Sequence, residues 1–227
     1  MTVLIRKFLS TKTIRSDKRR SIELTAVLVT AAGKFIFMDY LNWRFPFVIT
    51  AIAAWICYIL YRNSHDKATL KNWGFRTDNF SKTVKMILPF GLLAVLTFII
   101  IGFFQKTLNP TWHLLPVLLF YPLWGIIQQY LLIALVAGNL NNMVGVSISH
   151  FTIILLTAIL FSVVHYPDYW LMSGTFILAL FYGYVYLKSP NLYALGLFHG
   201  WLGAIFYYTV INRDPFLETF GKLLNLT

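Results

Sequence analysis

The chain has 227 residues, of which 58% are hydrophobic and only 12% are charged, and its mean hydropathy is +0.68. A soluble domain carries about 25% charged residues, so this composition excludes a soluble globular domain of any size and predicts an integral membrane protein. The net charge of +11 does not indicate nucleic-acid binding, because the basic residues lie in two short blocks beside apolar stretches, where they predict topology and contacts to anionic lipid.

The two basic blocks set the expected topology. The first 20 residues contain seven Lys or Arg and one acid, Asp17. Residues 62–85 contain six Lys or Arg and are predicted to form a loop. Because Lys and Arg accumulate on the cytoplasmic side of membrane proteins, we expect both blocks to be cytoplasmic.

Apolar stretches fill most of the remaining sequence, and a helix needs roughly 20 apolar residues to cross the hydrocarbon. The turn-forming run 138–142 separates two of these stretches within a segment, residues 107–167, that has no charged residue. The predicted spans are residues 22–41, 45–61, 86–104, 113–137, 146–164, 169–187 and 192–211.

We therefore predict an all-α, polytopic transmembrane helix bundle of about seven spans in the cell membrane. Its divisions are a basic cytoplasmic segment at residues 1–21, a transmembrane domain at residues 22–211 and a short interfacial tail at residues 212–227. An odd number of spans places the C-terminus outside. The apolar side of the tail helix is expected to contain Phe216, Phe220, Leu223 and Leu224.

Polar residues within the spans are the candidate functional residues, because a polar side chain in hydrocarbon is costly and is usually buried against protein or water. Gln128 and Gln129 lie near the middle of the fourth span and point about 100° apart on a helix. Pro116 and Pro122 precede them and favour a kink. Taken alone, such a glutamine pair is typical of interhelical hydrogen bonding.

Two histidines mark the fifth and seventh spans. His165 ends the fifth span in Phe161-Ser-Val-Val-His165, where a histidine at a membrane interface is typical of a structural role. His199 lies inside the seventh span, where a histidine is less common and indicates function as readily as structure. The remaining polar residues of the spans and their ends are expected to be structural or to snorkel: Lys34, Asp39, His113, His150 and Asp168.

In combination, these residues resemble the CPBP family of intramembrane proteases, which includes the CAAX prenyl endopeptidases and bacterial bacteriocin-processing and self-immunity proteins. That family has three motifs on successive core helices, Glu-Glu-x-x-x-Arg, Phe-x-x-x-His and His-x-x-x-Asn. Phe161 and His165 match the second motif, and His199 begins the third. Two further stretches are similar to the family: residues 183–199, which lead to the third motif, and Trp73-Gly74-Phe75-Arg76, which precedes the third span.

The resemblance covers about residues 70–211, but several motif positions differ. Gln128 and Gln129 stand in place of Glu-Glu, Ile133 in place of Arg, and Gly203 in place of the last Asn. The resemblance implies an intramembrane site where glutamates and histidines activate a water, either with glutamate as the base or with metal assistance. A glutamine amide does not accept a proton near neutral pH and is a poor zinc ligand. Ile133 fits this loss, because an arginine without its carboxylate partner would be costly in a membrane.

We therefore predict a CPBP-like membrane protein that binds a membrane peptide and has altered or lost peptidase activity. One alternative is an active intramembrane endopeptidase of unusual mechanism, with a histidine as base. Another is a small transporter or lipid-binding protein, with the charged residues of the first span and the glutamine pair lining a path. The expected partners are the lipid membrane and a membrane peptide or protein, and no nucleic acid. The candidate site residues are Gln128, Gln129, His165 and His199, of which the two histidines would be the ligands of a divalent metal such as zinc.

Overall fold

A computed structural model describes the backbone of residues 2–221 and the side chains of residues 14–221, and over this range the chain forms helices and no strands. The helices are α1 (Thr2–Gly33), α2 (Arg44–His65), α3 (Thr69–Trp73), α4 (Phe80–Gln105), α5 (Leu114–Gln129), α6 (Asn139–Asn142), α7 (His150–Val163), α8 (Tyr169–Lys188), α9 (Leu192–Phe206) and α10 (Pro215–Phe220). Three π-helical segments extend α1, α5 and α9, namely η1 (Lys34–Tyr40), η2 (Tyr130–Gly138) and η3 (Tyr207–Ile211).

Helices occupy all seven predicted spans, which confirms the all-α fold. Within the described range, six helical runs are long and apolar enough to cross a membrane. The fifth predicted span corresponds to α7, which is apolar but has only 14 residues and is therefore not among these six. At 1.5 Å per residue it is about 21 Å long, shorter than a hydrocarbon core of about 30 Å. The expectation of about seven spans is therefore roughly met.

Two predicted connections are more helical than the sequence indicates. The predicted loop at residues 62–85 contains the end of α2, the whole of α3 and the start of α4. The run 138–142 is not a turn, because the helix continues through α6 and ends at Asn142. The Asn139 amide donates to the Glu23 carboxylate at 2.7 Å, and the Asn142 amide donates to the Gly138 carbonyl at 2.7 Å. These bonds satisfy the asparagines in a helical conformation.

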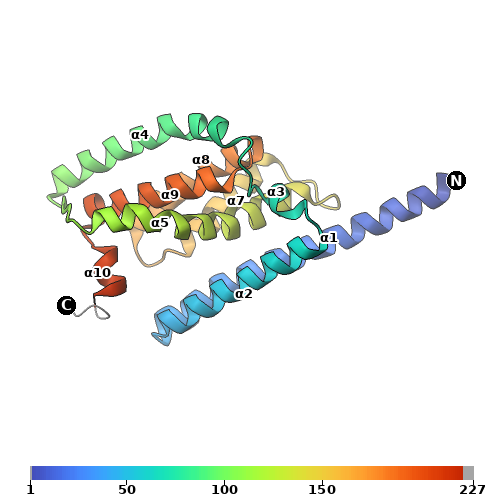
Figure 1. Cartoon of the computed structure of the whole chain (residues 1–227), viewed down its shortest axis with the longest axis horizontal. Coiled ribbons are helices and arrows are strands. Elements are labelled where there is room, and N and C mark those ends of the chain that lie inside the picture. The colour runs from blue at the N-terminus through green and yellow to red at the C-terminus, as the bar shows by residue number, and fades with distance from the viewer. Residues whose placement is uncertain (1, 222–227) are drawn as a thin grey trace. The chain divides into compact units, whose positions relative to one another are not determined.

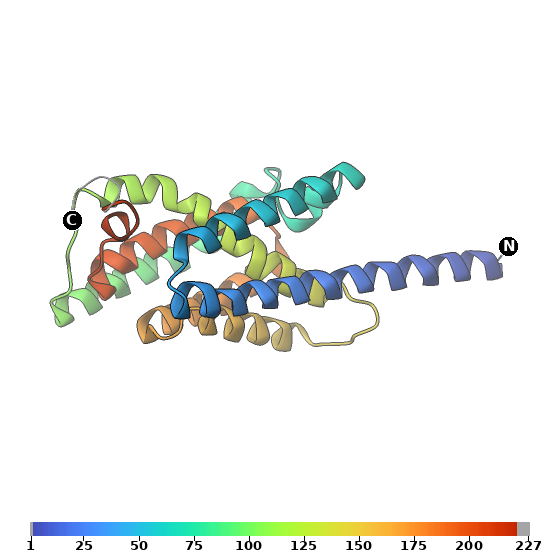
Figure 2. The ribbon, with the colours of Figure 1, turned by 90° about the horizontal axis from the view of Figure 1, so that it is seen from below.

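The chain divides into two compact units. Unit 1 contains Met1–Trp73 and Tyr130–Lys188, and unit 2 contains Gly74–Gln129 and Ser189–Thr227, each within the described range. In unit 1, α1 and α2 form a helical hairpin (Figures 1 and 2), in which the Trp55 indole donates to the Thr30 hydroxyl at 3.2 Å. A second part of unit 1 packs η2, α7 and α8 around a small apolar core of Leu132, Ala158, Phe161 and Ala179.

In unit 2, α5 and α9 lie side by side, with α4 beside α9 (Figure 1). Their core contains Val117, Ala204 and Tyr208. At the end of this unit, α10 begins after Asp214 and ends at Phe220, within the predicted tail. The predicted contributions of Leu223 and Leu224 lie outside the described residues.

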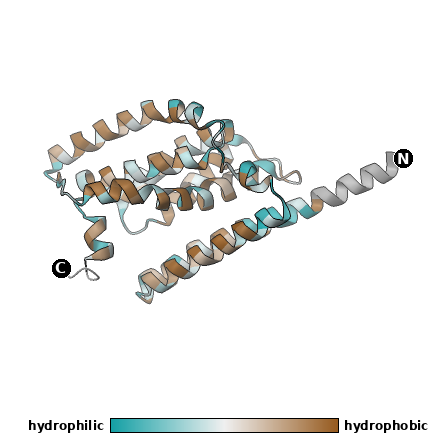
Figure 3. Cartoon of the chain, in the orientation of Figure 1, coloured by the Kyte–Doolittle hydropathy of each residue, from teal (hydrophilic) through white to brown (hydrophobic). Residues whose placement is uncertain are grey.

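The outward faces of the helices are apolar. Figure 3 shows hydrophobic residues along most of α4, and Leu92 and Leu93 on this helix are each 63% exposed. Large exposed apolar surfaces of this kind are unfavourable in water and are expected against lipid. The chain is therefore a multi-pass membrane protein.

Candidate intramembrane site

Three glycines let α5 and α9 approach each other closely. A Cβ atom on Gly125 would lie 2.3 Å from the Gly196 carbonyl oxygen. A Cβ on Gly196 would lie 2.6 Å from backbone atoms of Ile126, and one on Gly200 would lie 2.4 Å from the Pro122 nitrogen. Small residues at a crossing bring two membrane helices into backbone contact. This crossing sets the positions of the polar side chains close to it, Gln129 on α5 and His199 on α9.

The crossing places Gln129 beside His199. Gln129 lies one turn after Gly125, and His199 is adjacent to Gly200. Both side chains are buried, with exposed fractions of 0% and 7%. The Gln129 side-chain amide forms a hydrogen bond of 3.0 Å, measured from its Nε2, with the His199 Nδ1. Among the described residues, the buried Gln129 Oε1 has no hydrogen-bond partner.

The N-terminus of α9 is fixed by the segment that precedes α4. The Asn191 side chain accepts from the Ala194 amide at 2.9 Å as the N-cap, and its own amide donates to the Arg76 carbonyl and to the Asn79 Oδ1, each at 2.7 Å. Gly74 has φ +97°, and its carbonyl accepts from the Leu192 amide at 2.8 Å. Two stretches that resemble the family at the sequence level are therefore in direct contact, which sets the start of the helix that carries His199.

The other positions of the first motif surround Gln129 in sequence. Gln128 is half-buried and forms no hydrogen bond to a described residue, so Gln129 and not Gln128 is the glutamine bonded to His199. The helix changes to π geometry at Tyr130, directly after the pair, and such segments are frequent at functional sites. Ile133 lies in η2 and is 0% exposed.

The last motif position contacts α5. A Cβ atom on Gly203 would lie 3.2 Å from the Tyr121 ring, so an asparagine at this position requires the ring to move. Tyr121 itself packs against the Val117–Ala204–Tyr208 core. The absence of a side chain at Gly203 therefore leaves room for the Tyr121 ring.

His165 belongs to unit 1, in the turn that follows α7. It is half-buried, and its Nδ1 donates to the Phe161 carbonyl at 2.7 Å. This bond places the proton on Nδ1 and leaves the Nε2 lone pair available as a base or a ligand. Burial lowers the pKa of His165, although the bond to the Phe161 carbonyl opposes this. The convergence of His165 with the Gln129–His199 pair stays a prediction.

The family's mechanism raises the question of a metal, and the side chains present do not fit one. The described residues contain no group of three or more His, Cys, Asp or Glu side chains that could hold a metal ion. The His199 Nδ1 lone pair accepts from an amide, and Gln is a poor zinc ligand. We therefore derive no step through a metal.

The other predicted polar residues form local contacts in unit 1 and unit 2. The Lys34 ammonium donates to the Asp39 carboxylate at 2.6 Å and to the Tyr166 carbonyl at 2.9 Å. His113 donates from Nδ1 to the Asp214 carboxylate at 2.7 Å. These contacts support their expected structural roles.

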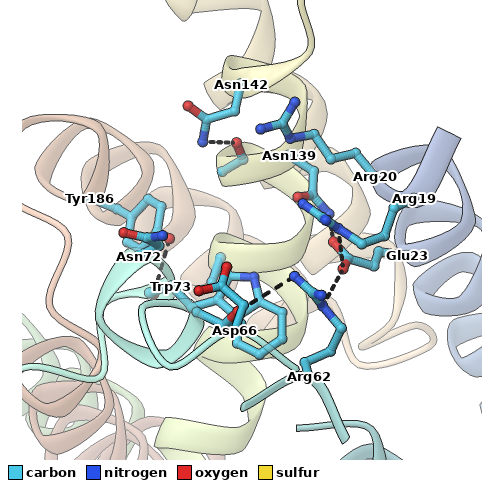
Figure 4. A pocket seen from close by; sticks show the side chains of 13 residues that line it. Arg19, Arg20, Glu23, Arg62, Asp66, Asn72, Trp73, Asn139, Asn142 and Tyr186 are labelled. Carbon is cyan, nitrogen blue, oxygen red and sulfur yellow. Dashed lines mark hydrogen bonds and ion pairs between the residues drawn. The ribbon is translucent and has the colours of Figure 1, made fainter. Parts of the chain in front are cut away.

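Sequence reasoning missed a buried acid, Glu23, at the start of the first predicted span. It is 4% exposed, and its carboxylate accepts from the Tyr58 hydroxyl and from the Asn139 amide. The Nε atoms of Arg19 and Arg62 lie 3.7 and 3.8 Å from the same carboxylate oxygen (Figure 4). An acid inside a span beside a basic block is the signal that would have identified this cluster.

With this geometry established, the protein is a helical membrane protein with a buried Gln–His pair at a glycine-dependent helix crossing. Residues 107–205 match the protein-family model described as Rce1-like, type II CAAX prenyl endopeptidase Rce1-like. The match includes Gln128, Gln129, His165 and His199, and it confirms the resemblance to the CAAX protease-like (CPBP) family over this part of the chain. Comparisons with curated proteins and with solved structures found no match.

Proposed function

We propose that this CAAX protease-like protein has lost water-activating peptidase chemistry and binds a membrane peptide at the α5–α9 crossing. The Gln129–His199 hydrogen bond carries the proposal. A carboxylate at position 129 would accept the His199 Nδ1 proton and leave Nε2 as a base. The amide instead donates to Nδ1, so Nε2 is an N–H donor.

The same pair supports peptide binding. Among described residues, the Gln129 Oε1 is buried without a hydrogen-bond partner, which costs about 1–3 kcal/mol. A backbone N–H of a bound peptide would satisfy this oxygen. The surrounding apolar helices would accommodate the apolar side chains of a membrane peptide.

The residues at the other motif positions support the view that several positions of the family's site have changed together in this chain. Ile133 is fully buried, so an arginine there would need a partner that Gln128 and Gln129 do not supply. Gly203 fits closely against Tyr121.

The proposed setting is the cell membrane, with the N-terminus in the cytoplasm. The support is the distribution of Lys and Arg, with seven in the first 20 residues and six in residues 62–85. The proposed ligand is a membrane peptide or protein segment.

The test uses the purified full-length chain with a fluorescent membrane peptide. We expect binding without cleavage, and weaker binding by Gln129→Leu, which removes the amide but keeps an apolar side chain. Gln105→Leu is a matched control, because Gln105 is exposed at the end of α4. Cleavage by the native protein that His199→Ala abolishes would overturn the loss of activity, and peptide binding unaffected by Gln129→Leu would overturn the proposed binding site.

A further inference from the structure

A small cavity lies in unit 1, at the ends of several helices. Its volume is about 100 Å³, and its walls come from α1, α2, α3, α6, η2 and α8. Three arginines and three asparagines line it, and Figure 4 shows Glu23 beside Arg19 and Arg62. The polar groups that line it are mainly hydrogen-bond donors, from Arg19, Arg20, Arg62, Asn72, Asn139 and Asn142.

The acids near the cavity are already engaged. Glu23 accepts from Tyr58 and Asn139, as described above. Asp66 accepts from the Ala68 amide at 3.0 Å. The Glu23 carboxylate is therefore shared among several donors, and Asp66 forms no ion pair with a described guanidinium group.

Three guanidinium groups line the cavity, and among the described residues two carboxylates, Asp17 and Glu23, lie within ion-pair distance of them. Arg20 forms an ion pair with Asp17 at 2.9 Å. Arg19 and Arg62 both lie near one oxygen of Glu23, so two guanidinium groups share one carboxylate. An anion in the cavity would give Arg19 and Arg62 a second ion-pair partner.

The two guanidinium groups also have unused donors. Each has five N–H donors. Among described residues, the buried Nε atoms of Arg19 and Arg62 have no hydrogen-bond partner, and Arg62 donates only one long bond, 3.5 Å, to the Thr69 hydroxyl. The Arg62 side chain is only 12% exposed, so water reaches little of it. The Nε atoms lie against Glu23, so a ligand with several acceptor oxygens would accept from the terminal N–H groups of the two guanidinium groups.

We infer that this cavity binds a phosphate group, held by Arg19 and Arg62 with the neighbouring asparagine amides. Arginine forks bind phosphate oxygens with two parallel hydrogen bonds, which matches several convergent and unused donors. A water occupies about 30 Å³ of liquid, so the cavity has room for a phosphate-sized group. The cavity lies beside the basic N-terminal block, where the headgroup of an anionic lipid would supply the phosphate.

The inference is tested on the purified full-length chain with two probes. One is inorganic phosphate, compared with chloride at equal ionic strength. The other is phosphatidylcholine vesicles with and without phosphatidic acid. Thermal unfolding and equilibrium binding are measured for the native chain, Arg19→Gln and Arg62→Gln. Arg44→Gln is the matched control, because Arg44 is exposed at the other end of α2.

We expect affinity for one or both probes to fall about tenfold or more in Arg19→Gln and Arg62→Gln, because each loses a charge-assisted hydrogen bond. Arg44→Gln should bind like the native chain. Saturable binding of inorganic phosphate would identify a free phosphate as the ligand, and binding of phosphatidic acid alone would identify a lipid headgroup. Arg19 is 41% exposed, so Arg19→Gln provides the test even if Arg62→Gln does not fold. Equal binding by the native chain and Arg19→Gln, or no binding of either probe, would overturn the inference.

Discussion

The side-chain amide of Gln129 donates a hydrogen bond of 3.0 Å to Nδ1 of His199, and so joins α5 to α9 within unit 2. Two motif positions that are 70 residues apart in the sequence are therefore in direct contact. The pair occupies the place of an acid–histidine interaction, and in the proposed function the amide reverses the direction of the hydrogen bond. This reversal is the basis of the first prediction.

Restoring the motif charges should restore water activation if the scaffold is otherwise intact. The change is Gln128→Glu, Gln129→Glu and Ile133→Arg together. General-base catalysis contributes roughly 10²- to 10⁴-fold in rate, so we expect cleavage of membrane-peptide substrates by the triple variant and little or none by the native chain. The measurement is product formation by mass spectrometry, with His199→Ala added to the triple variant as the control.

The last motif position gives a second arm of the same experiment. Gly203→Asn places a side chain 3.2 Å or less from the Tyr121 ring, so it should be combined with Tyr121→Ala. If the triple variant is inactive but the quintuple variant cleaves, the missing asparagine limits activity. Inactivity of both folded variants would contradict the view that only these motif positions disable the site.

The helix crossing should not tolerate a side chain at Gly196. A Cβ atom there meets Ile126 Cγ1 at 2.3 Å and backbone atoms at 2.6 Å, so Gly196→Ala should destabilise the protein by about 1–3 kcal/mol and weaken peptide binding. The measurement is thermal unfolding in detergent. Gly145→Ala is the control, since its Cβ would meet the nearest atom, Asp17 Oδ2, at 3.5 Å, and it should leave the unfolding temperature nearly unchanged.

The span positions followed from local sequence, but the pairing of Gln129 with His199 did not. An apolar run in lipid leaves the backbone no other hydrogen-bonding option than a helix, so the composition predicts most of the spans. The motif resemblance marked Gln129 and His199 as candidate site residues beside Gln128 and His165, but it did not show which glutamine bonds to which histidine. The crossing that brings the pair together could not be predicted either, because the sequence does not show which glycines face the neighbouring helix.

The run 138–142 shows why the remaining features could not be predicted. Asn139 is a turn former by local propensity, but its partner Glu23 is 116 residues away in the sequence. No local sequence pattern predicts this hydrogen bond. The burial of Glu23 could not be predicted for the same reason, because it depends on Tyr58 and Asn139 from two other helices.

The bond between Asn139 and Glu23 should stabilise unit 1. Asn139→Ala removes a hydrogen bond to a buried charged group, which is worth about 1.5–3 kcal/mol. Asn142→Ala removes only a local bond to the Gly138 carbonyl and should cost less. Thermal unfolding of both variants gives the comparison. A larger loss for Asn142→Ala than for Asn139→Ala would contradict the importance of the Glu23 cluster.

The topology can be tested by cysteine labelling. Cys57 is the only cysteine and is exposed, so Cys57→Ala gives a background without thiols. Lys67→Cys should react only from the cytoplasmic side, and Asn109→Cys, beyond α4, only from outside the cell, because a single span separates them. Labelling of Lys67→Cys by an impermeant reagent added to intact cells would show that the orientation is reversed.

The stability of the C-terminal end of unit 2 should depend on Asp214. Its carboxylate accepts from the Thr111 hydroxyl at 3.0 Å and from the His113 Nδ1 and the Tyr208 hydroxyl at 2.7 Å each. It also caps α10 through the Phe216 amide at 3.0 Å. Partial burial would raise the pKa of Asp214, but these hydrogen bonds together lower the pKa below its usual value.

Because the folded-state pKa of Asp214 is lowered, the carboxylate stabilises the fold above its unfolded-state pKa of about 4 and loses this effect as the pH falls through the lower folded-state pKa. Asp214→Asn should therefore reduce the free energy of unfolding near neutral pH by about 1 kcal/mol or more and flatten its decline in acid. The measurement is thermal unfolding over a pH series. Glu218→Gln, on the same helix but 35% exposed and paired with Arg213, should keep the native pH profile. If Asp214→Asn shows the same acid slope as the native chain, other carboxylates control the acid response.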